Sequence, residues 1–302
     1  MIKVGCCGYP TSMKKYFDNF CLVELNRTFY EYPRMATVMG WREKAPTDFE
    51  FTVKAHQDIS HRFKFEIEPS LKAFEQMKQI CEALKARILL IQTPGSFRPE
   101  RLNAAEKFFH KMYRNDLAIV WETRGAAWDT SDARRRLVRA LAELNVSHVT
   151  DPFKNMPAYT SDITYFRLHG LGKELYYYQY TNDELRQLYE LVSPLELEGK
   201  QVYILFNNLA MFEDGFRFKH YIEKYSFPSL TGAVGFDSVR SLIEKTRYPI
   251  AKHLLLKRLG WRLVELEHDK QTRLNELLRT MAPKSYRSAE EVLQEIKRTQ
   301  KL

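Results

Sequence analysis

Polar side chains stand at the ends of short apolar runs throughout this 302-residue chain. In ITYFRLHG, an aliphatic and aromatic stretch ends in Arg167 and His169, and in AIVWE a similar stretch ends in Glu122, with Arg124 two residues later. Charged and strongly polar groups are costly inside an apolar core. The pattern therefore predicts strands whose ends open onto one polar site.

These strand ends offer cations, carboxylates, amides and a histidine that titrates near neutrality. We expect Glu122 and His169 to act as an acid/base pair, with Lys54 and Asp151 as further catalytic residues. Arginines bind phosphate oxygens in a bidentate manner, so the set favours a phosphate-bearing substrate. The expected substrate-binding residues are Glu24, Asn26, Tyr30, Gln92, Arg124, Trp128, Arg167, Tyr178, Asn207 and Asn208.

Lys54 ends the run FTVK, where we expect Arg124 and Arg167 nearby. Like charge and partial burial would disfavour its protonated form, which makes its amine a candidate nucleophile toward an aldehyde. The open-chain sugar of an abasic nucleotide is such an aldehyde. The alternative is that Lys54 only holds phosphate.

The cofactor is unknown from the sequence, and a divalent metal remains open. Candidate ligands are Glu24, His61, Glu122, Asp151 and His169. The cations expected around them oppose a metal's charge. The four cysteines show no C-x-x-C spacing, which argues against a zinc site and a disulfide framework.

Helical patterns separate the apolar runs, which is typical of a parallel sheet built from βα units. Residues 33–46 and 69–84 carry helical spacing, and residues 152–162 look irregular. Two capping boxes are expected, Asn103 with Glu106 and Thr181 with Glu184.

The eight expected strands are KVGCC, LVELN, FTVKA, ILLIQT, AIVWE, SHVTD, TYFRLHG and VYILFNN. We expect an α/β fold, a (β/α)₈ TIM barrel, with its site at the carboxyl ends of the strands. A doubly wound open sheet is the alternative, but no G-x-G-x-x-G or P-loop supports its nucleotide-binding form.

Several motifs together resemble the YecE-like proteins, a family of unknown function with a TIM-barrel fold. They are G-x-x-G-Y at residues 5–9, VELNRTFYEYP, FTVKA, E-x-R-x-x-x-W, Y-x-R-x-H-G and YILFNN. The resemblance covers about residues 2–225 and implies a fold and a pocket, without an established reaction. We therefore expect a barrel domain at residues 1–225 and a mainly helical, basic extension at residues 226–302.

The extension carries most of the chain's excess charge. From Glu244 onward, 14 Lys and Arg face 8 Asp and Glu, a net +6 of the formal +9. A basic segment favours nucleic acid through counterion release; the expected contacts are Lys252, Lys257, Arg258 and Arg262. HLLLKRLGWRLVELEHDKQTRLNELL also resembles the closing helix, strand and helix of RAP-type and very-short-patch-repair-type endonuclease folds. An ordinary helical cap on the barrel is the alternative.

The sequence thus predicts a nucleic-acid processing enzyme, a hydrolase or lyase such as a nuclease or an enzyme that acts on damaged bases or abasic sites. One alternative is an isomerase, lyase or hydrolase of a sugar phosphate, and another is a nucleic-acid-binding adaptor without catalysis.

No apolar run approaches the roughly 18 residues needed to span a bilayer. The chain opens with strand-like IKVGCC, so we expect a cytoplasmic protein without a membrane partner.

Overall fold

The computed structural model describes residues 1–267 and 270–300. The chain divides into two compact units: residues 1–168 with 188–207 form the first, and residues 169–187 with 208–302 form the second. The expected boundary between residues 225 and 226 stays a prediction.

The first unit is built on eight parallel strands, paired in the order β6-β5-β4-β3-β2-β1-β8-β7. A parallel bridge between Thr150, just after β6, and Phe166 of β7 connects the two ends of this order, so the barrel is nearly closed. The strands are β1 (Ile2–Cys7), β2 (Leu22–Leu25), β3 (Glu50–Lys54), β4 (Ile88–Gln92), β5 (Ala118–Glu122), β6 (Ser147–Val149), β7 (Ile163–Leu168) and β8 (Gln201–Phe206). This confirms the predicted TIM-barrel fold and its eight strands.

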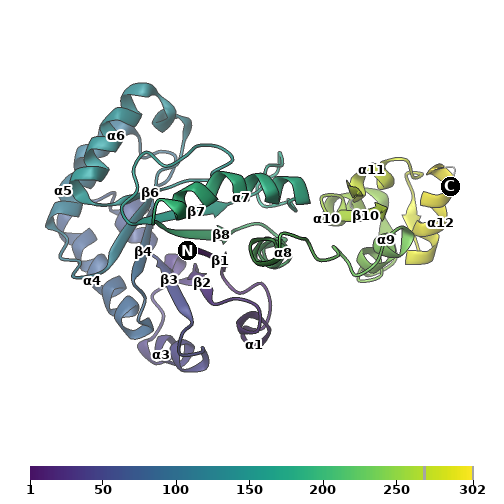
Figure 1. Cartoon of the computed structure of the whole chain (residues 1–302), viewed down its shortest axis with the longest axis horizontal. Coiled ribbons are helices and arrows are strands. Elements are labelled where there is room, and N and C mark those ends of the chain that lie inside the picture. The colour runs from purple at the N-terminus through teal and green to yellow at the C-terminus, as the bar shows by residue number, and fades with distance from the viewer. Residues whose placement is uncertain (268–269, 301–302) are drawn as a thin grey trace. The chain divides into compact units, whose positions relative to one another are not determined.

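Helices lie outside the strands, and Figure 1 shows α3 to α6 around one side of the barrel. The helices of this part are α1 (Met13–Phe17), α2 (Arg27–Tyr30), α3 (Met35–Lys44), α4 (Ile67–Leu84), α5 (Leu102–Lys111), α6 (Ser131–Leu144) and α7 (Asn182–Leu197), the last of which begins in the second unit. The predicted helices at residues 33–46 and 69–84 are confirmed as α3 and α4.

One of the two predicted capping boxes is present. The Thr181 backbone N–H donates to Glu184 Oε2 at 2.8 Å, and the Glu184 N–H donates to Thr181 Oγ1 at 3.2 Å, which satisfies two free donors at the start of α7. The box at Asn103 is wrong, because α5 already begins at Leu102 with Arg101 as its N-cap.

The barrel interior is apolar in the middle and polar at both ends. Successive side chains of a strand alternate between its two faces, and the buried inward-facing cluster includes Leu22, Leu90, Val120, Tyr165 and Leu205. At the amino ends of the strands, Lys3 Nζ contacts Glu50 at 2.5 Å and Tyr203 Oη at 3.0 Å. The polar residues at the carboxyl ends form the site described below.

The second unit has its own core, formed by buried residues from Val239 to Ile296. Its elements are α8 (Met211–Lys224), α9 (Phe236–Ile243), β9 (Ile250–Ala251), α10 (Lys252–Leu259), β10 (Leu263–Glu267), β11 (Lys270–Arg273), α11 (Leu274–Arg279), β12 (Ser285–Tyr286) and α12 (Ala289–Gln300). The expected helix, strand and helix correspond to α10, β10 and α11. The sequence missed β11, which pairs antiparallel with β10.

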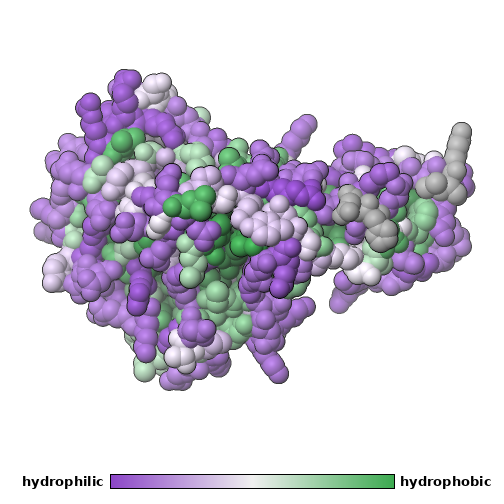
Figure 2. All heavy atoms as spheres, viewed as in Figure 1, coloured by the Kyte–Doolittle hydropathy of each residue, from purple (hydrophilic) through white to green (hydrophobic). Residues whose placement is uncertain are grey.

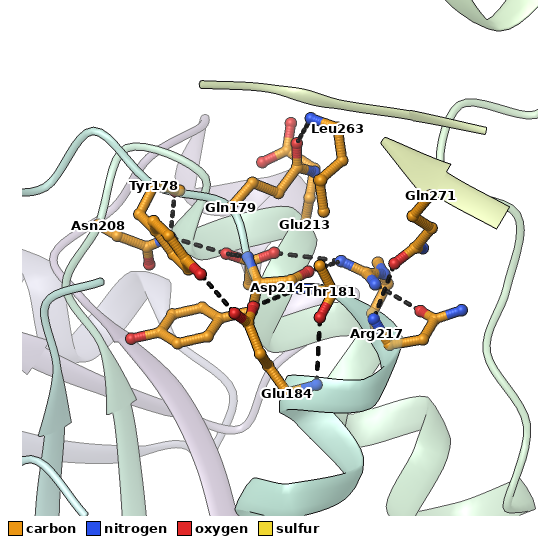
Figure 3. A network of polar contacts seen from close by, with 12 residues as sticks. Tyr178, Gln179, Thr181, Glu184, Asn208, Glu213, Asp214, Arg217, Leu263 and Gln271 are labelled. Carbon is orange, nitrogen blue, oxygen red and sulfur yellow. Dashed lines mark hydrogen bonds and ion pairs between the residues drawn. The ribbon is translucent and has the colours of Figure 1, made fainter. Parts of the chain in front are cut away.

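A buried polar network connects the segments of the second unit (Figure 3). Asp214 Oδ2 accepts from Asn208 Nδ2 at 2.7 Å and from the Tyr180 N–H at 3.2 Å. Gln179 Oε1 accepts from the Leu263 N–H at 2.9 Å, which holds β10 against the segment before α7. Asn208 also donates to the Tyr178 carbonyl at 2.8 Å, so this side chain, predicted to bind substrate, has a structural position instead.

The face of the protein seen in Figure 2 is mainly hydrophilic, with smaller apolar areas between charged side chains. Within residues 1–267 and 270–300, no helix combines the length and apolar character required for a membrane span.

Candidate active site

The carboxyl ends of the barrel strands bring several predicted residues together in the first unit. Hydrogen bonds connect Glu24 of β2, Gln92 of β4, Glu122 of β5 and Arg167 of β7. Lys54 is the last residue of β3. The expected clustering of these strand ends is therefore present within this unit.

Arg167 is the centre of a buried ion-pair network. Its Nε and Nη2 donate to the two carboxylate oxygens of Glu24 at 3.0 and 2.9 Å, and its Nη1 donates to Glu122 Oε2 at 2.5 Å. Tyr165 Oη donates to Glu24 Oε2 at 2.8 Å. Arg167 is 1% exposed, so a role in binding substrate phosphate does not fit this geometry. It serves instead as the buried counterion of two carboxylates.

Glu122 connects this network to a more exposed arginine. Its Oε1 accepts from Arg124 Nε at 2.9 Å and from Gln92 Nε2 at 3.2 Å. The Arg124 side chain is 35% exposed. Arg124 therefore keeps the predicted ability to meet an anionic group, which Arg167 lacks.

Lys54 is buried beside this network. Its Nζ lies 3.9 Å from the centroid of the Phe29 ring. Within the part of the chain that the structure describes, this ammonium has no hydrogen-bond or ion-pair partner. Burial, followed by the positive charge of Arg167, lowers the pKa of Lys54 from 10.5 to about 8, against the opposing effect of Glu24 and Glu122. The lowered pKa agrees with the effect predicted from the sequence.

His61 also contacts Phe29, with the two rings edge to face and 5.0 Å between their centroids. Ser60 Oγ donates to the Gln92 carbonyl at 2.5 Å, so its contact with His61 Nδ1 at 3.0 Å requires the histidine to donate. His61 Nε2 is then an acceptor. Burial, with the charges of Lys54 and Arg124, lowers the pKa of His61 to about 4, which keeps the ring neutral.

Other residues predicted for the site have different surroundings. Trp128 is buried, stacked on Phe97 and hydrogen-bonded through Nε1 to the Phe97 carbonyl at 2.9 Å, so it belongs to the core. Asp151 is buried, and its Oδ1 accepts from the Phe153 N–H at 3.2 Å. Of the remaining predicted residues in the first unit, Asn26 lies 3.4 Å from Arg167 Nη2, Tyr30 is exposed, and Asn207 is partly exposed after β8.

His169, Tyr178 and Asn208 belong to the second unit. His169 is buried against the Tyr176 ring, with 5.9 Å between the ring centroids. Tyr178 Oη bonds to Glu184 of α7. The pairing of His169 with Glu122 as acid and base stays a prediction.

The predicted metal ligands do not form a metal site in residues 1–267 and 270–300, where no group of three or more His, Cys, Asp or Glu is arranged to hold an ion. Glu24 and Glu122 are already neutralised by arginines. The carboxylates that a divalent cation would need therefore have other partners.

Two of the predicted nucleic-acid contacts are engaged within the second unit. Lys252 Nζ donates to the carbonyls of Arg279 and Met281, and Arg262 pairs with Glu213 at 3.3 Å. Lys257 and Arg258 are exposed on α10.

Sequence reasoning did not assign Tyr165 or Ser60 to the site. Tyr165 precedes Arg167 by two residues and so shares its face of β7, which the strand period could have revealed. Nothing in the sequence marks Ser60, because its role depends on the fold that places it beside Gln92.

Comparisons with known proteins concern the barrel. A family described as "Protein of unknown function DUF72" matches residues 7–222. UPF0759 protein YunF of Bacillus subtilis (strain 168) is 26% identical over 250 residues, which cover 69% of this chain and 89% of that protein. The solved structure of a DUF72 family protein from Enterococcus faecalis V583 is 25% identical, with a TM-score of 0.62, and the match covers 75% of this chain and 98% of that one. A DUF72 family protein from Thermotoga maritima MSB8 is also 25% identical, with a TM-score of 0.61 and coverage of 74% and 100%.

The family match ends at residue 222, before the basic extension. The expected resemblance of the barrel to a family of unknown function is thus supported. The resemblance of the extension to endonuclease folds stays a prediction.

Proposed function

Because this chain belongs to the DUF72 family of proteins of unknown function, we propose a reaction from the site itself: Lys54 forms an imine with an aldehyde or ketone carbon of a sugar-derived substrate, and the protein is a lyase. The observation that carries this proposal is the buried Lys54 ammonium, which lies over the Phe29 ring and forms no ion pair among the described residues.

Burial favours the neutral form of Lys54, and the positive charge of Arg167 adds to this effect. The carboxylates of Glu24 and Glu122 are matched by the guanidinium groups of Arg167 and Arg124. A protonated Lys54 adds an unmatched positive charge to this cluster, and a neutral Lys54 does not. With a pKa of about 8, about a tenth of the amine is unprotonated at pH 7, some hundreds of times more than at the ordinary lysine pKa.

Lys54 is also a better candidate nucleophile than the nearby thiol of Cys7. Burial and then the Glu24 charge raise the pKa of Cys7 well above its usual range, which keeps the thiol protonated. A thiol must lose its proton to be a good nucleophile.

The proposed step begins with a bond from the neutral Lys54 nitrogen to the carbonyl carbon, while the carbonyl electron pair moves to oxygen. The oxygen takes up a proton, and loss of water leaves a protonated imine. This cation draws electrons from the neighbouring carbon, so elimination of a phosphate or cleavage of a carbon–carbon bond becomes possible. Gln92 and the neutral His61 provide groups that can orient substrate hydroxyls.

The first substrate to consider is an abasic position in nucleic acid. Its open-chain sugar presents an aldehyde between two phosphates, and the partly exposed Arg124 supplies a cation for one of them. A free sugar phosphate carries the same two groups and is the second candidate. Both substrates require the imine at Lys54.

Reductive trapping tests this proposal. The protein is incubated with an abasic oligonucleotide, or separately with ribose 5-phosphate or glyceraldehyde 3-phosphate, in the presence of cyanoborohydride, and the adduct is located by peptide mass spectrometry. We expect one dominant adduct at Lys54 that is absent from Lys54→Met.

Lys3→Met is the matched control, because Lys3 also points into the barrel but is paired with Glu50. It should keep the adduct. Equal trapping by Lys54→Met, or no adduct with any of these carbonyl compounds, would refute the imine.

A further inference from the structure

The second unit contains a cavity of about 650 Å³, which is within the range of about 300–1,000 Å³ found for ligand sites. It lies between the segment that precedes α7, the helices α10 and α11, the turn that follows α10, and the end of β11. The side chains that matter for its chemistry are Lys173, Tyr177, Lys257, Trp261, Arg273 and Arg279.

The lining is strongly cationic. Four of these side chains are positive, and Glu174 is the one acidic residue of the lining. Among the described residues, no carboxylate pairs with Lys173, Lys257 or Arg279, and all three are exposed. Their charges are therefore not neutralised by ion pairs with these carboxylates and can interact with an anionic ligand.

Aromatic rings stand among these cations. Tyr177 meets Trp261 edge to face, with 6.2 Å between the ring centroids, and Tyr177 is 37% exposed. The Arg273 guanidinium lies 4.1 Å from the Tyr178 ring centroid and donates to the Trp261 carbonyl at 3.0 Å. Rings alternating with cations suit a ligand that has both flat surfaces and negative charges.

Two residues of the lining each carry a polar atom that is buried without a partner among the described residues: Trp261 Nε1, a donor, and Asn275 Oδ1, an acceptor. Both atoms are shielded from solvent, so the ligand is identified by the exposed rings and cations. Inorganic phosphate would satisfy the cations but has no flat face for the rings, and the acidic side chains of a peptide carry no such face either. A nucleobase has such a stacking face.

The walls of the cavity are held in place by the network of Figure 3. Gln179 fixes β10 through the Leu263 N–H, and Asn182 N–H donates to Gln271 of β11 at 2.8 Å. Tyr178 is additionally tied to the first turn of α7 through Glu184. The segment carrying Tyr177 and the elements carrying Trp261 and Lys257 are thus parts of one supported surface.

We propose that this cavity binds single-stranded nucleic acid, with a base stacked on Tyr177 or Trp261 and phosphates on Lys173, Lys257 and Arg279. A duplex keeps its bases stacked on each other and cannot offer them to these rings. This inference concerns binding alone and does not depend on the chemistry proposed for Lys54.

Fluorescence anisotropy with the full-length protein tests the site, using a labelled thymidine or uridine oligomer of roughly ten nucleotides and the matching duplex. The oligomers contain no aldehyde, so a failure here leaves the Lys54 proposal standing, and a failure of imine trapping leaves this one standing. Titrations are repeated between about 0.05 and 0.3 M salt, because phosphate contacts determine the salt dependence.

We expect the single strand to bind more tightly than the duplex. Lys257→Gln combined with Arg279→Gln should reduce the slope of log affinity against log salt by about 1.4, since each lost phosphate contact on a single strand contributes about 0.7. Lys245→Gln combined with Arg247→Gln is the matched control, because both residues are exposed cations of the same unit and neither lines the cavity. It should change the affinity by less than about twofold.

Tyr177→Leu and Trp261→Leu should each weaken binding roughly tenfold while leaving the salt slope unchanged, as expected for lost stacking. Tyr177 is exposed, so its replacement tests stacking even if Trp261→Leu fails to fold. The proposal is overturned if the single strand does not bind, if the Lys245/Arg247 double variant weakens binding as much as the Lys257/Arg279 double variant, or if Tyr177→Leu has no effect.

Discussion

Two lysines point into the same barrel from opposite ends and have opposite electrostatic surroundings. Lys3, near the start of β1, contacts Glu50 at 2.5 Å and Tyr203 at 3.0 Å, and its side chain is 23% exposed. Lys54, at the end of β3, is 7% exposed and lies against the Phe29 ring, and no carboxylate within residues 1–267 and 270–300 forms an ion pair with it. Lys3 thus has a structural role in an ion pair, whereas the surroundings of Lys54 lower the pKa of its amine.

The difference arises first from burial, which lowers the pKa of Lys54, and then from the positive charge of Arg167. At the carboxyl end of the barrel, both nearby carboxylates are bound by this arginine, which leaves none for Lys54. At the amino end, Glu50 contacts Lys3 and accepts from Tyr203 Oη at 2.6 Å. A buried arginine can therefore lower the pKa of a neighbouring lysine through its own charge, while it also binds the carboxylates whose charge opposes that effect.

Replacing Arg167 should have the largest effect on stability. Arg167→Met leaves two buried carboxylates without their counterion, and we expect the free energy of unfolding to fall by about 3–5 kcal/mol. Lys3→Met, at a partly exposed pair, should lower it by about 1 kcal/mol or less. Urea denaturation of both variants measures the contrast, and similar losses would contradict the distinction between the two ends.

Replacing Lys54 should instead stabilise the protein at neutral pH. The folded-state pKa of about 8 lies below the unfolded value of 10.5, so the charged amine opposes folding below pH 8, and this cost disappears as pH rises to about 10.5. Lys54→Met should therefore raise the free energy of unfolding near pH 7 by up to about 3 kcal/mol, less any packing loss.

The gain from Lys54→Met should fade between about pH 8 and about pH 10.5. Denaturation curves for wild type and variant at several pH values reveal this. A gain that is constant with pH would mean that packing, not charge, is responsible.

Lys54 and its neighbours also show which features of the site the sequence could predict. The strand-end position of Lys54 and the presence of Arg124 and Arg167 were sufficient to predict a depressed pKa. The pairing of Arg167 with Glu24 was not predictable, because it joins residues 143 positions apart across the barrel. Without that pairing, Arg167 looked like a phosphate ligand.

The other differences between the sequence predictions and the structure also arise from contacts between residues that are distant in the sequence or from packing. Trp128 and Asn208 follow strands as loop residues do, but burial against Phe97 and Asp214 depends on packing that no local pattern specifies. The eight strands were predictable because their apolar runs are buried on both faces. The strand β11, KQTR, lacks such a run and is defined by its pairing with β10.

Supplying Lys54 with a carboxylate should make it resemble Lys3. Gln92→Glu is nearly isosteric and adds a negative charge beside Glu122, since Gln92 Nε2 lies 3.2 Å from Glu122 Oε1. We expect the pKa of Lys54 to rise by about one unit and imine trapping at pH 7 to fall about tenfold, with recovery near pH 9. Trapping that stays low at high pH would indicate damage to the site rather than a charge effect.

The smallest expected change comes from Arg124. Its positive charge is the last of the influences on the pKa of Lys54, so Arg124→Gln should raise that pKa by only a fraction of a unit. Trapping of an uncharged aldehyde such as propanal at pH 7 should fall by no more than about threefold. A phosphorylated aldehyde should lose more, because Arg124 is the exposed cation of the site; equal losses for the two would argue against phosphate binding there.

The most direct measurement is the pKa of the Lys54 amine itself. Trace acetic anhydride labels unprotonated lysines, and peptide mass spectrometry can follow Lys54 and Lys3 in the same samples from about pH 6 to about pH 11. We expect labelling of Lys54 to reach half its maximum near pH 8. If half-maximal labelling of Lys54 instead falls near the ordinary lysine value of about 10.5, the barrel does not hold an activated amine and the proposed imine chemistry is wrong.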